Sequence, residues 1–324
     1  MTAIDTISDR PQGPGHGAGR RLRLALSIAA VRPRFALGYF IVTVMVLSAL
    51  FAPLIAPHDP VFADPVRFLE PPGGDFLFGS DAVGMDVFSR VLYAPRIDLT
   101  IAVSATLISA VIGSLIGAWA GYFSRGSGLR GAVAGFVMRA ADVLQAFPVF
   151  VFAIALVASL GQSLHTVIAA IAFVSIPIYL RLMRAQVISI RERKFIEAAT
   201  VAGVSDGRII LRHVIPNALG PVLAQLSINI GWAILLTAGL SFVGAGVRPP
   251  TPEWGTMIAA GFQNVVTGQW WPSVFPGLAL ALTVFGFSLV GASIETFADP
   301  EKMRRLTRDV SARARRRQAR EARQ

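Results

Sequence analysis

The sequence predicts an all-α, polytopic membrane protein with six transmembrane helices. Its 324 residues are 54% hydrophobic and only 15% charged, a composition that is too apolar for a soluble domain. Six long stretches contain no Asp, Glu, Lys or Arg, and about 20 apolar residues suffice to cross a bilayer as a helix. Such segments must be helical, because each unpaired backbone polar group in lipid costs several kcal/mol.

The predicted spans follow a flexible tail. Residues 1–34 are rich in Gly, Pro and Arg and show no apolar period, which is typical of a flexible segment. The first span covers residues 35–57, whose 23 uncharged residues exceed the apolar region of a cleavable signal, so we expect it to remain as an anchor. The other five spans are predicted at about 99–123, 143–161, 163–180, 220–242 and 274–294.

Residues 143–180 are uncharged throughout and are long enough for two of these spans. Gly161, Gln162 and Ser163 offer a turn between the two. Within the first of them, Pro148 is expected to kink the helix, because proline frees a backbone carbonyl from its usual partner.

The basic residues indicate how the chain lies in the membrane. Of the 30 Lys and Arg residues, 26 lie in segments 1–34, 124–142, 181–213 and 295–324, which all fall on one side. Basic residues are enriched on the cytoplasmic side of membrane proteins, so both termini are predicted to be cytoplasmic. The net charge of +11 therefore faces anionic membrane lipid, not nucleic acid. The Arg-rich segment 299–324 is predicted to be a headgroup anchor or a solvated tail.

Residues 58–98 form a predicted external loop that is acidic, with seven carboxylates against three arginines. Within it, a turn rich in Gly and Asp at 78–90 leads into an amphipathic helix. Asp86 and Arg90 stand one helical turn apart and are predicted to pair, which is worth a few tenths of a kcal/mol. This helix is either an interfacial brace of the bundle or a docking element.

A short, charged, helix-forming stretch at 194–216 separates the fourth and fifth spans. The small side chains of Ala198 and Ala199 let another backbone come close, and Gly203 can end a helix in the left-handed conformation. Asp206 and the serine before it offer caps for a second helix, which a proline closes where the next apolar run begins. The pattern predicts a helix–turn–helix outside the membrane, with Ala, Gly and Ile surfaces facing a partner.

The spacing of this stretch resembles that of the cytoplasmic EAA loop of ABC importer permeases. The Glu-Ala-Ala triplet begins at Glu197, a glycine follows at Gly203, and a proline stands at the twentieth position. In that family the helix of the loop docks into a cleft of a separate ATPase subunit. An amphipathic helix resting on lipid headgroups is the alternative, and a DNA-reading helix–turn–helix is disfavoured because a membrane span joins each end. The resemblance assigns ATPase coupling to Glu197, Ala198, Ala199, Gly203, Asp206, Ile215 and Pro216.

Four segments resemble the dipeptide, oligopeptide and nickel branch of these permeases. In the segment 78–96, Met85 stands where relatives carry a basic residue, so we expect no role for that charge in this chain. The resemblance covers roughly residues 36–290 and implies a type I importer transmembrane core over about 97–298, preceded by one extra N-terminal span. The four segments are 78–96, 138–148, 181–197 and 240–255.

The sequence shows no motif for catalysis or cofactor binding. Neither of its two lysines lies in a Gly-x-x-x-x-Gly-Lys-Ser/Thr phosphate-binding loop. We therefore expect no enzymatic activity and no cofactor in this chain, and ATP bound by partner subunits. The four histidines are scattered without metal-ligand spacing: His16, His58, His165 and His213.

By resemblance, the chain is a permease subunit of an ATP-driven importer that carries short peptides or a related small solute across the bacterial inner membrane. The implied partners are a second homologous permease, two ATPase subunits and a periplasmic or lipid-anchored solute-binding protein. Transport of nickel or another non-peptide solute is the alternative within this machinery. A channel or secondary transporter is less favoured, because the spans lack the ionisable side chains that usually mark ion-coupled transport. Candidate pathway residues, which hydrogen bonding between helices explains equally well, are Gln145, Gln225, Ser227 and Asn229.

Overall fold

The computed structural model describes residues 33–124, residue 126 and residues 128–298. These residues form helices joined by loops, with no β-strand among them. The predicted tails at 1–34 and 299–324 lie outside the described residues, except for residues 33 and 34. The prediction of an all-α fold is confirmed for the part of the chain that is described.

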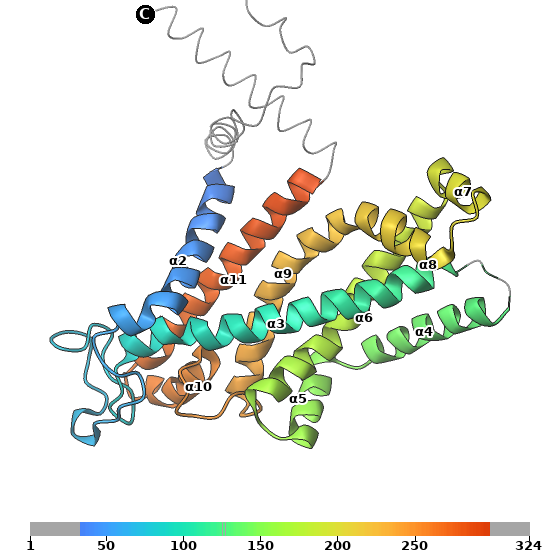
Figure 1. The fold of residues 1–324 in the computed structure, drawn as a ribbon. Helices are drawn as coiled ribbons and strands as arrows, with labels where there is room; N and C mark the ends of the chain where they lie inside the picture. Colours follow the sequence, from blue (N-terminus) through green and yellow to red (C-terminus); the bar gives the residue numbers. More distant parts are fainter. Residues whose placement is uncertain (1–32, 125, 127, 299–324) are drawn as a thin grey trace, which may run out of the picture.

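The helices follow one another along the chain as drawn in Figure 1. Five stretches are long and apolar enough to cross a membrane, namely α2, α3, α6, α8 to α9, and α11. The bent pair α4 and α5 passes the same test when it is counted as one segment, and the total then equals the predicted six. The bounds are α2 Pro33–Ile55, η1 Pro65–Arg67, α3 Val87–Tyr122, α4 Leu129–Ala146, α5 Val149–Leu160, α6 Leu164–Arg191, α7 Lys194–Val201, α8 Asp206–Ile209, the π-helical turn η2 Ile210–Val214, α9 Ile215–Phe242, α10 Trp254–Val265 and α11 Trp271–Ala298.

The third membrane segment is broken, where the sequence predicts only a kink within a span at 143–161. The axes of α4 and α5 differ in direction by 93°. Phe147, between them, is extended with a ψ of 140°, the conformation that a residue before proline favours. Pro148 has no N–H with which to continue the helical hydrogen bonding. Residues 143–146 therefore end α4, and the remainder of the predicted span forms α5.

The helix predicted before the second span is continuous with it, so α3 has 36 residues and a length of roughly 54 Å. Asp86 is the N-cap of α3, because its carboxylate accepts hydrogen bonds from the backbone N–H groups of Phe88 and Ser89. The predicted pairing of Asp86 with Arg90 is wrong, since the cap turns Asp86 toward the start of the helix. The Nε atom of Arg90 lies instead 3.8 Å from a carboxylate oxygen of Asp81.

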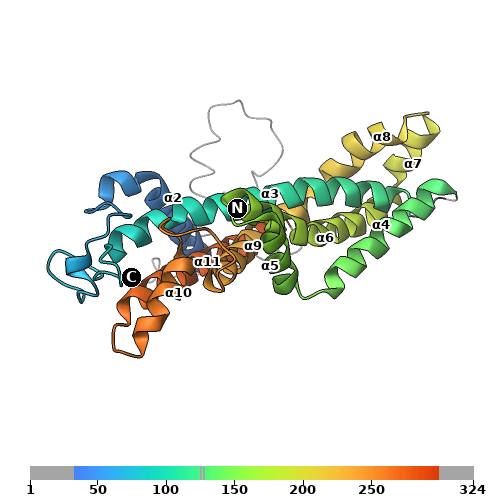
Figure 2. The ribbon, with the colours of Figure 1, turned by 90° about the horizontal axis from the view of Figure 1, so that it is seen from below.

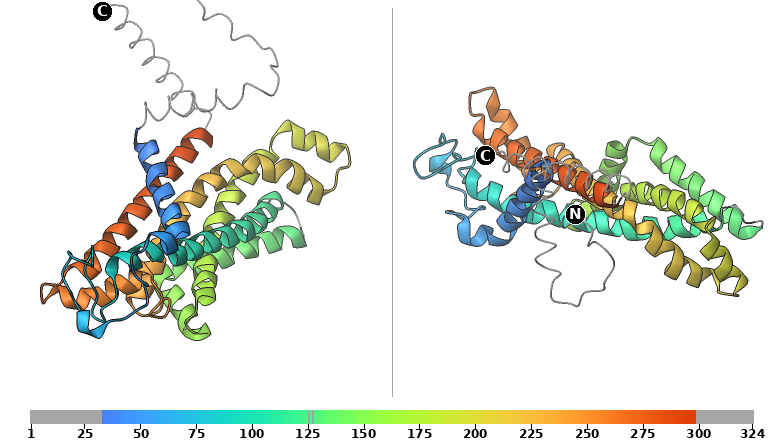
Figure 3. Two further views of the ribbon diagram at one scale, coloured as in Figure 1. Left: turned by 60° about the vertical axis from the view of Figure 1, so that its left-hand side comes forward. Right: turned by 90° about the horizontal axis from the view of Figure 1, so that it is seen from above.

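The membrane segments alternate in direction and give the bundle two ends, visible in Figure 1. The α10 end holds the loop between α2 and α3, the turn between α5 and α6, and α10. The α7 end holds α7, α8, the end of α3 and the start of α4. Figure 3 shows α2 beside α11, and the Tyr39 hydroxyl lies 3.3 Å from the Ser293 hydroxyl between these helices. The N-terminal span therefore packs on one side of the bundle.

A row of three glycines on α3 brings its backbone against α6, and we call this contact the glycine seam. Gly113, Gly117 and Gly121 recur every four residues and face α6. A Cβ atom added at Gly117 would lie 2.4 Å from the carbonyl oxygen of Leu180, and one added at Gly113 would lie 2.6 Å from that of Ile176. Small residues allow such close approach of helices in membranes. Figure 2 shows α3 and α6 running side by side along this contact.

Candidate functional site

The α7 helix ends at a glycine in the way that the sequence predicts. Gly203 has a φ of 75°, a left-handed conformation that glycine adopts without strain. Its N–H donates to the carbonyl of Thr200 at 3.0 Å, and the N–H of Val204 donates to the carbonyl of Ala199 at 3.1 Å. These two bonds form a Schellman motif, which satisfies two carbonyls at the end of the helix. The predicted conformation of Gly203 is confirmed.

The side chains predicted to cap the next helix do not form capping hydrogen bonds. Ser205 occupies the N-cap position of α8, but its side chain makes no capping hydrogen bond. Asp206 accepts a hydrogen bond from the Tyr122 hydroxyl at 3.0 Å and forms an ion pair with Arg130 at 3.1 Å. Asp206 therefore connects the turn to α3 and α4, and the capping prediction is wrong.

The chain remains helical from α8 into α9, without the predicted turn at Pro216. Between them, η2 is a π-helical turn in which the N–H of Ile215 donates to the carbonyl of Ile210. Pro216 is the second residue of α9, which directly follows the π-helical turn, where the regular helical hydrogen bonding is already interrupted. The side chain of Asn217 also donates to the carbonyl of His213 at 2.7 Å. The second helix of the motif is thus the beginning of the fifth membrane segment.

The segment from α7 to η2 has a buried face and an exposed face. The buried face packs on a cluster at the ends of α3 and α6 that includes Tyr122, Met183 and Val187. Ala199 and Ile215, two of the residues assigned to coupling, are partly buried against this cluster. The fully packed side chains of the buried face are Ile196, Ile209, Ile210 and Val214.

The exposed face, which we call the α7 outer face, is formed by Glu197, Ala198, Val201, Gly203 and Leu211. Val201 is 84% exposed and Leu211 is 63% exposed, although both side chains are apolar. Val201 lies on α7, outside the membrane-spanning stretches, and a large apolar side chain exposed there indicates a contact surface. The α7 outer face therefore combines a small-residue helix with apolar side chains on a rigid support.

A surface pocket of about 600 Å³ adjoins the turn between α7 and α8. It lies between the end of α3, the start of α4 and the turn. Aromatic, charged and small residues line it: Trp119, Phe123, Arg130, Val204, Ser205, Asp206, Gly207 and Ile210.

The four candidate pathway residues do not form one cluster. Ser227 and Asn229 are buried, and they bond to the Phe287 carbonyl at 2.9 Å and the Thr106 hydroxyl at 3.3 Å, respectively. These contacts favour hydrogen bonding between helices for these two residues. Gln145 lies on α4 and lines a small cavity against α5 and α6, whereas the other three lie on α9.

At the α10 end, a buried arginine joins three segments. The Nη1 atom of Arg90 donates to the carbonyl of Pro60 at 2.8 Å and to the carbonyl of Pro250 at 3.1 Å. Arg90 lies on α3, Pro60 follows α2, and Pro250 precedes α10. The guanidinium group therefore holds both loops of this end on α3.

Two buried carboxyl groups at the α10 end were not among the site residues predicted from the sequence. Glu253 caps α10 and accepts from the N–H groups of Gly255 at 2.8 Å and Thr256 at 2.7 Å. Asp98 accepts from the N–H of Trp254 at 3.2 Å. Both side chains are fully buried. Glutamate is not among the residues favoured at N-caps, and Asp98 stands at the edge of an uncharged run, so neither gave a clear signal.

The loop between α2 and α3 also carries exposed ion pairs. Arg67 lies 2.8 Å from Glu70 and 3.2 Å from Asp75. The hydrogen bonds from Arg67 lower the pKa of the Glu70 carboxyl below its ordinary value. These contacts link three residues within the exposed part of the loop.

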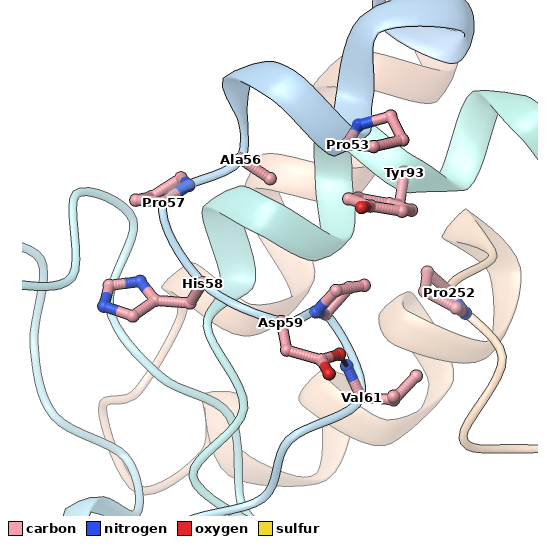
Figure 4. A pocket seen from close by; sticks show the side chains of 9 residues that line it. Pro53, Ala56, Pro57, His58, Asp59, Val61, Tyr93 and Pro252 are labelled. Atoms are coloured by element: carbon pink, nitrogen blue, oxygen red, sulfur yellow. Dashed lines mark hydrogen bonds between the residues drawn. The ribbon is translucent and has the colours of Figure 1, made fainter.

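A second surface pocket, of about 590 Å³, lies beside this loop at the α10 end. Figure 4 shows His58 and Asp59 from the segment after α2, Tyr93 from α3 and Pro252 from the loop before α10. Among the described residues, no three His, Asp or Glu side chains are grouped so that they could hold a metal ion. The pocket is lined by Pro53, Ala56, Pro57, His58, Asp59, Pro60, Val61, Tyr93 and Pro252.

Comparison with known proteins identifies the family. Residues 113–304 match the binding-protein-dependent transport system inner membrane component, and residues 32–72 match the N-terminal TM domain of oligopeptide transport permease C. The chain is 38% identical to a dipeptide transport system permease protein of Alkalihalophilus pseudofirmus, over 82% of this chain and 84% of the relative. It is 37% identical to a probable D,D-dipeptide transport system permease protein of Escherichia coli, over 93% of this chain and 98% of the relative.

A glutathione transport system permease protein of Escherichia coli is also 37% identical, over 90% of this chain and 92% of the relative. The first family match covers more than half of the chain and includes the whole segment from α7 to η2. The second match covers α2, the additional N-terminal span. The chain therefore belongs to the family of binding-protein-dependent transport system inner membrane components, multi-pass ABC transporter permeases whose type I transmembrane domain is here preceded by one extra span.

Proposed function

We propose that this chain is the permease subunit of an ATP-driven importer that carries short peptides across the bacterial cytoplasmic membrane. The α7 outer face is the observation that carries the proposal. It presents the small and apolar side chains of α7 outside the membrane-spanning stretches, and the opposite face of the segment from α7 to η2 is packed on α3 and α6. A partner that pushes on this face would act directly on the membrane bundle.

In this proposal the α7 end lies in the cytoplasm and the α10 end faces the outside. The distribution of Lys and Arg supports that orientation, with 26 of 30 residues in segments at the α7 end or in the two tails. Two separate ATPase subunits bind and hydrolyse ATP, one of them at the α7 outer face. A second, similar permease completes the path, and a solute-binding protein delivers the solute to the α10 end. This chain itself binds no cofactor.

The names of the relatives support short peptides as the substrate class. Two of them are named as dipeptide permeases and one as a glutathione permease, and glutathione is itself a tripeptide. Two of the candidate pathway residues, Gln145 and Gln225, are partly buried and have amide groups that could hydrogen-bond to peptide groups.

Transport by the complete complex tests the proposal. The chain is purified with its companion permease, ATPases and binding protein, and the complex is placed in proteoliposomes. We expect uptake of a labelled dipeptide that requires both ATP and the binding protein, and no ATP hydrolysis by this chain alone. Uptake that proceeds without ATP, or that follows a proton gradient, would show a channel or a secondary transporter instead.

Reporter fusions test the orientation independently. Fusions after residue 75 and after residue 260, both at the α10 end, should report an external location. A fusion after residue 200, in α7, should report a cytoplasmic one. An external signal from the fusion in α7 would contradict ATPase docking at this face.

A further inference from the structure

We propose that Tyr122, the last residue of α3, is a positioning residue that transmits movement of the turn between α7 and α8 to α3. The inference rests on the proposed function, in which ATPases act on the α7 outer face. It assigns the transmission to one hydroxyl group and its acceptor on Asp206.

Tyr122 is bonded to both flanks of the α7 segment. Its hydroxyl donates to the carboxylate of Asp206 at 3.0 Å, just after the turn. Its carbonyl accepts from Nη1 of Arg191 at 2.6 Å, just before α7, and the Arg191 guanidinium lies 5.5 Å from the centre of the Tyr122 ring. The residue just before α7 and the residue just after its turn are therefore both hydrogen-bonded to a single residue of α3.

The two polar contacts of Asp206 differ in their surroundings. Arg130 and Asp206 form an ion pair in which the side chains are 67% and 44% exposed, so water and salt weaken it. Tyr122, in contrast, is buried and only 7% exposed. A hydrogen bond to a charged acceptor is stronger than one between neutral groups, and limited access of water preserves that strength. The bond from Tyr122 is therefore the firmer of the two.

Polar contacts join the turn to α3 in addition to packing, since Val204, Ile209 and Ile210 belong to or pack on the same apolar cluster as Tyr122. The pocket of about 600 Å³ lies between Trp119, Phe123 and the residues of the turn, with Arg130 and Asp206 in its wall. The polar contacts of Asp206 lie at the edge of this open space. A displacement of the turn is therefore passed on to α3 by these bonds together with the apolar cluster beneath them.

The long helix α3 extends the effect to the other end of the bundle. Its 36 residues run unbroken from Val87 to Tyr122. At the α10 end, Arg90 of the same helix holds the Pro60 and Pro250 carbonyls. Because α3 is continuous, with Pro95 near its start, a shift imposed at Tyr122 is carried along the helix toward the point where both loops are attached.

The test compares Tyr122→Phe with Tyr93→Phe in the reconstituted importer with its ATPases and binding protein. Tyr122→Phe removes only the hydroxyl and keeps the ring and the backbone carbonyl. Tyr93 lies on the same helix, and its hydroxyl forms no hydrogen bond with any of the described residues. Tyr93→Phe is therefore the matched control for the bond that Tyr122→Phe removes. ATP hydrolysis and uptake of labelled dipeptide are measured together, and their ratio is the readout.

We expect Tyr122→Phe to keep its ATPases and hydrolyse ATP, while uptake per ATP falls by about fivefold or more, the size of a typical coupling between sites. Asp206→Ala should give the same loss, and the double variant should be no worse than either single one. Asp206→Asn retains an acceptor oxygen for the tyrosine and should restore much of the uptake.

Three outcomes count against the inference. Uptake per ATP in Tyr122→Phe equal to that of Tyr93→Phe would show that the bond transmits nothing. Loss of the ATPases from Tyr122→Phe and Asp206→Ala would show that it only maintains the docking surface. Failure of the wild-type complex to show ATP-dependent uptake would overturn the proposed function, and this inference with it, whereas a wild-type complex that transports leaves the variants to decide.

Discussion

Replacement of Gly203 by valine tests whether the shape of the α7 outer face matters for coupling. At a φ of 75°, a residue with a Cβ atom suffers a strain of roughly 1–2 kcal/mol. A Cβ atom at this position would have no heavy atom within 4 Å, so packing within the chain adds nothing to that strain. A change of this size lowers the population of the capped turn by about 5- to 30-fold.

Gly207 provides a matched control four residues away. It lies in α8, its φ is outside the left-handed region, and a Cβ atom there also has open space around it. Gly207→Val should therefore leave the turn intact. Gly203→Asn separates shape from bulk, because asparagine has a side chain of similar size to valine but tolerates the left-handed conformation.

The assay is the affinity of the detergent-purified permease for its ATPase subunits, together with uptake in proteoliposomes. We expect Gly203→Val to insert into the membrane normally but to bind the ATPases more weakly and transport less, and Gly203→Asn to lie close to wild type. Glu197→Lys, which reverses a charge on the same face, should also weaken binding. Equal ATPase affinity in Gly203→Val and Gly207→Val would refute the reasoning that the capped turn is part of the docking surface.

Two further predictions concern the bundle itself. Gly117→Ala would place a Cβ atom 2.4 Å from a backbone oxygen of α6, so the helices must part by about 1 Å, and we expect a loss of roughly 1–3 kcal/mol in a detergent unfolding assay. Gly231→Ala, whose nearest atoms would lie at 3.4 Å, should be nearly neutral, and equal stability of the two variants would show that the seam is not tight. Arg90→Ala leaves two loop carbonyls without their donor and should cost about 1–3 kcal/mol for each that stays buried, measured as faster proteolysis of the loop between α2 and α3. An unchanged rate of proteolysis would mean that the loops keep their positions without the arginine.

Much of the fold could be predicted from the sequence because lipid permits few backbone structures. The uncharged runs located five of the membrane segments without any knowledge of residue packing, whereas the run at 143–161 contained α5 and only the end of α4. The conformation of Gly203 was also predictable, since a Schellman cap depends on local hydrogen bonds and on the absence of a Cβ atom.

Features that depend on tertiary contacts were not predictable. The sequence indicated that Pro148 would disturb a helix, but a bend of 93° depends on where α4 and α5 pack. The spacing of Asp86 and Arg90 favours an ion pair only if nothing competes. In the structure, backbone N–H groups bind Asp86, and distant carbonyls bind Arg90. Asp206 likewise found its partner on α3, 84 residues away in the sequence.

The glycine seam limits where the bundle can open. At Gly113 and Gly117 the backbone of α3 lies against the backbone of α6, with no side chain of α3 between them that could change rotamer and make room, so the two helices form a single slab. Tyr122 and Arg191, at the adjoining ends of this slab, are bonded to each other. A solute cannot pass between these two helices. An opening of the bundle is therefore expected at other helix contacts, such as those of α5, a helix of 12 residues that follows a sharp break after α4.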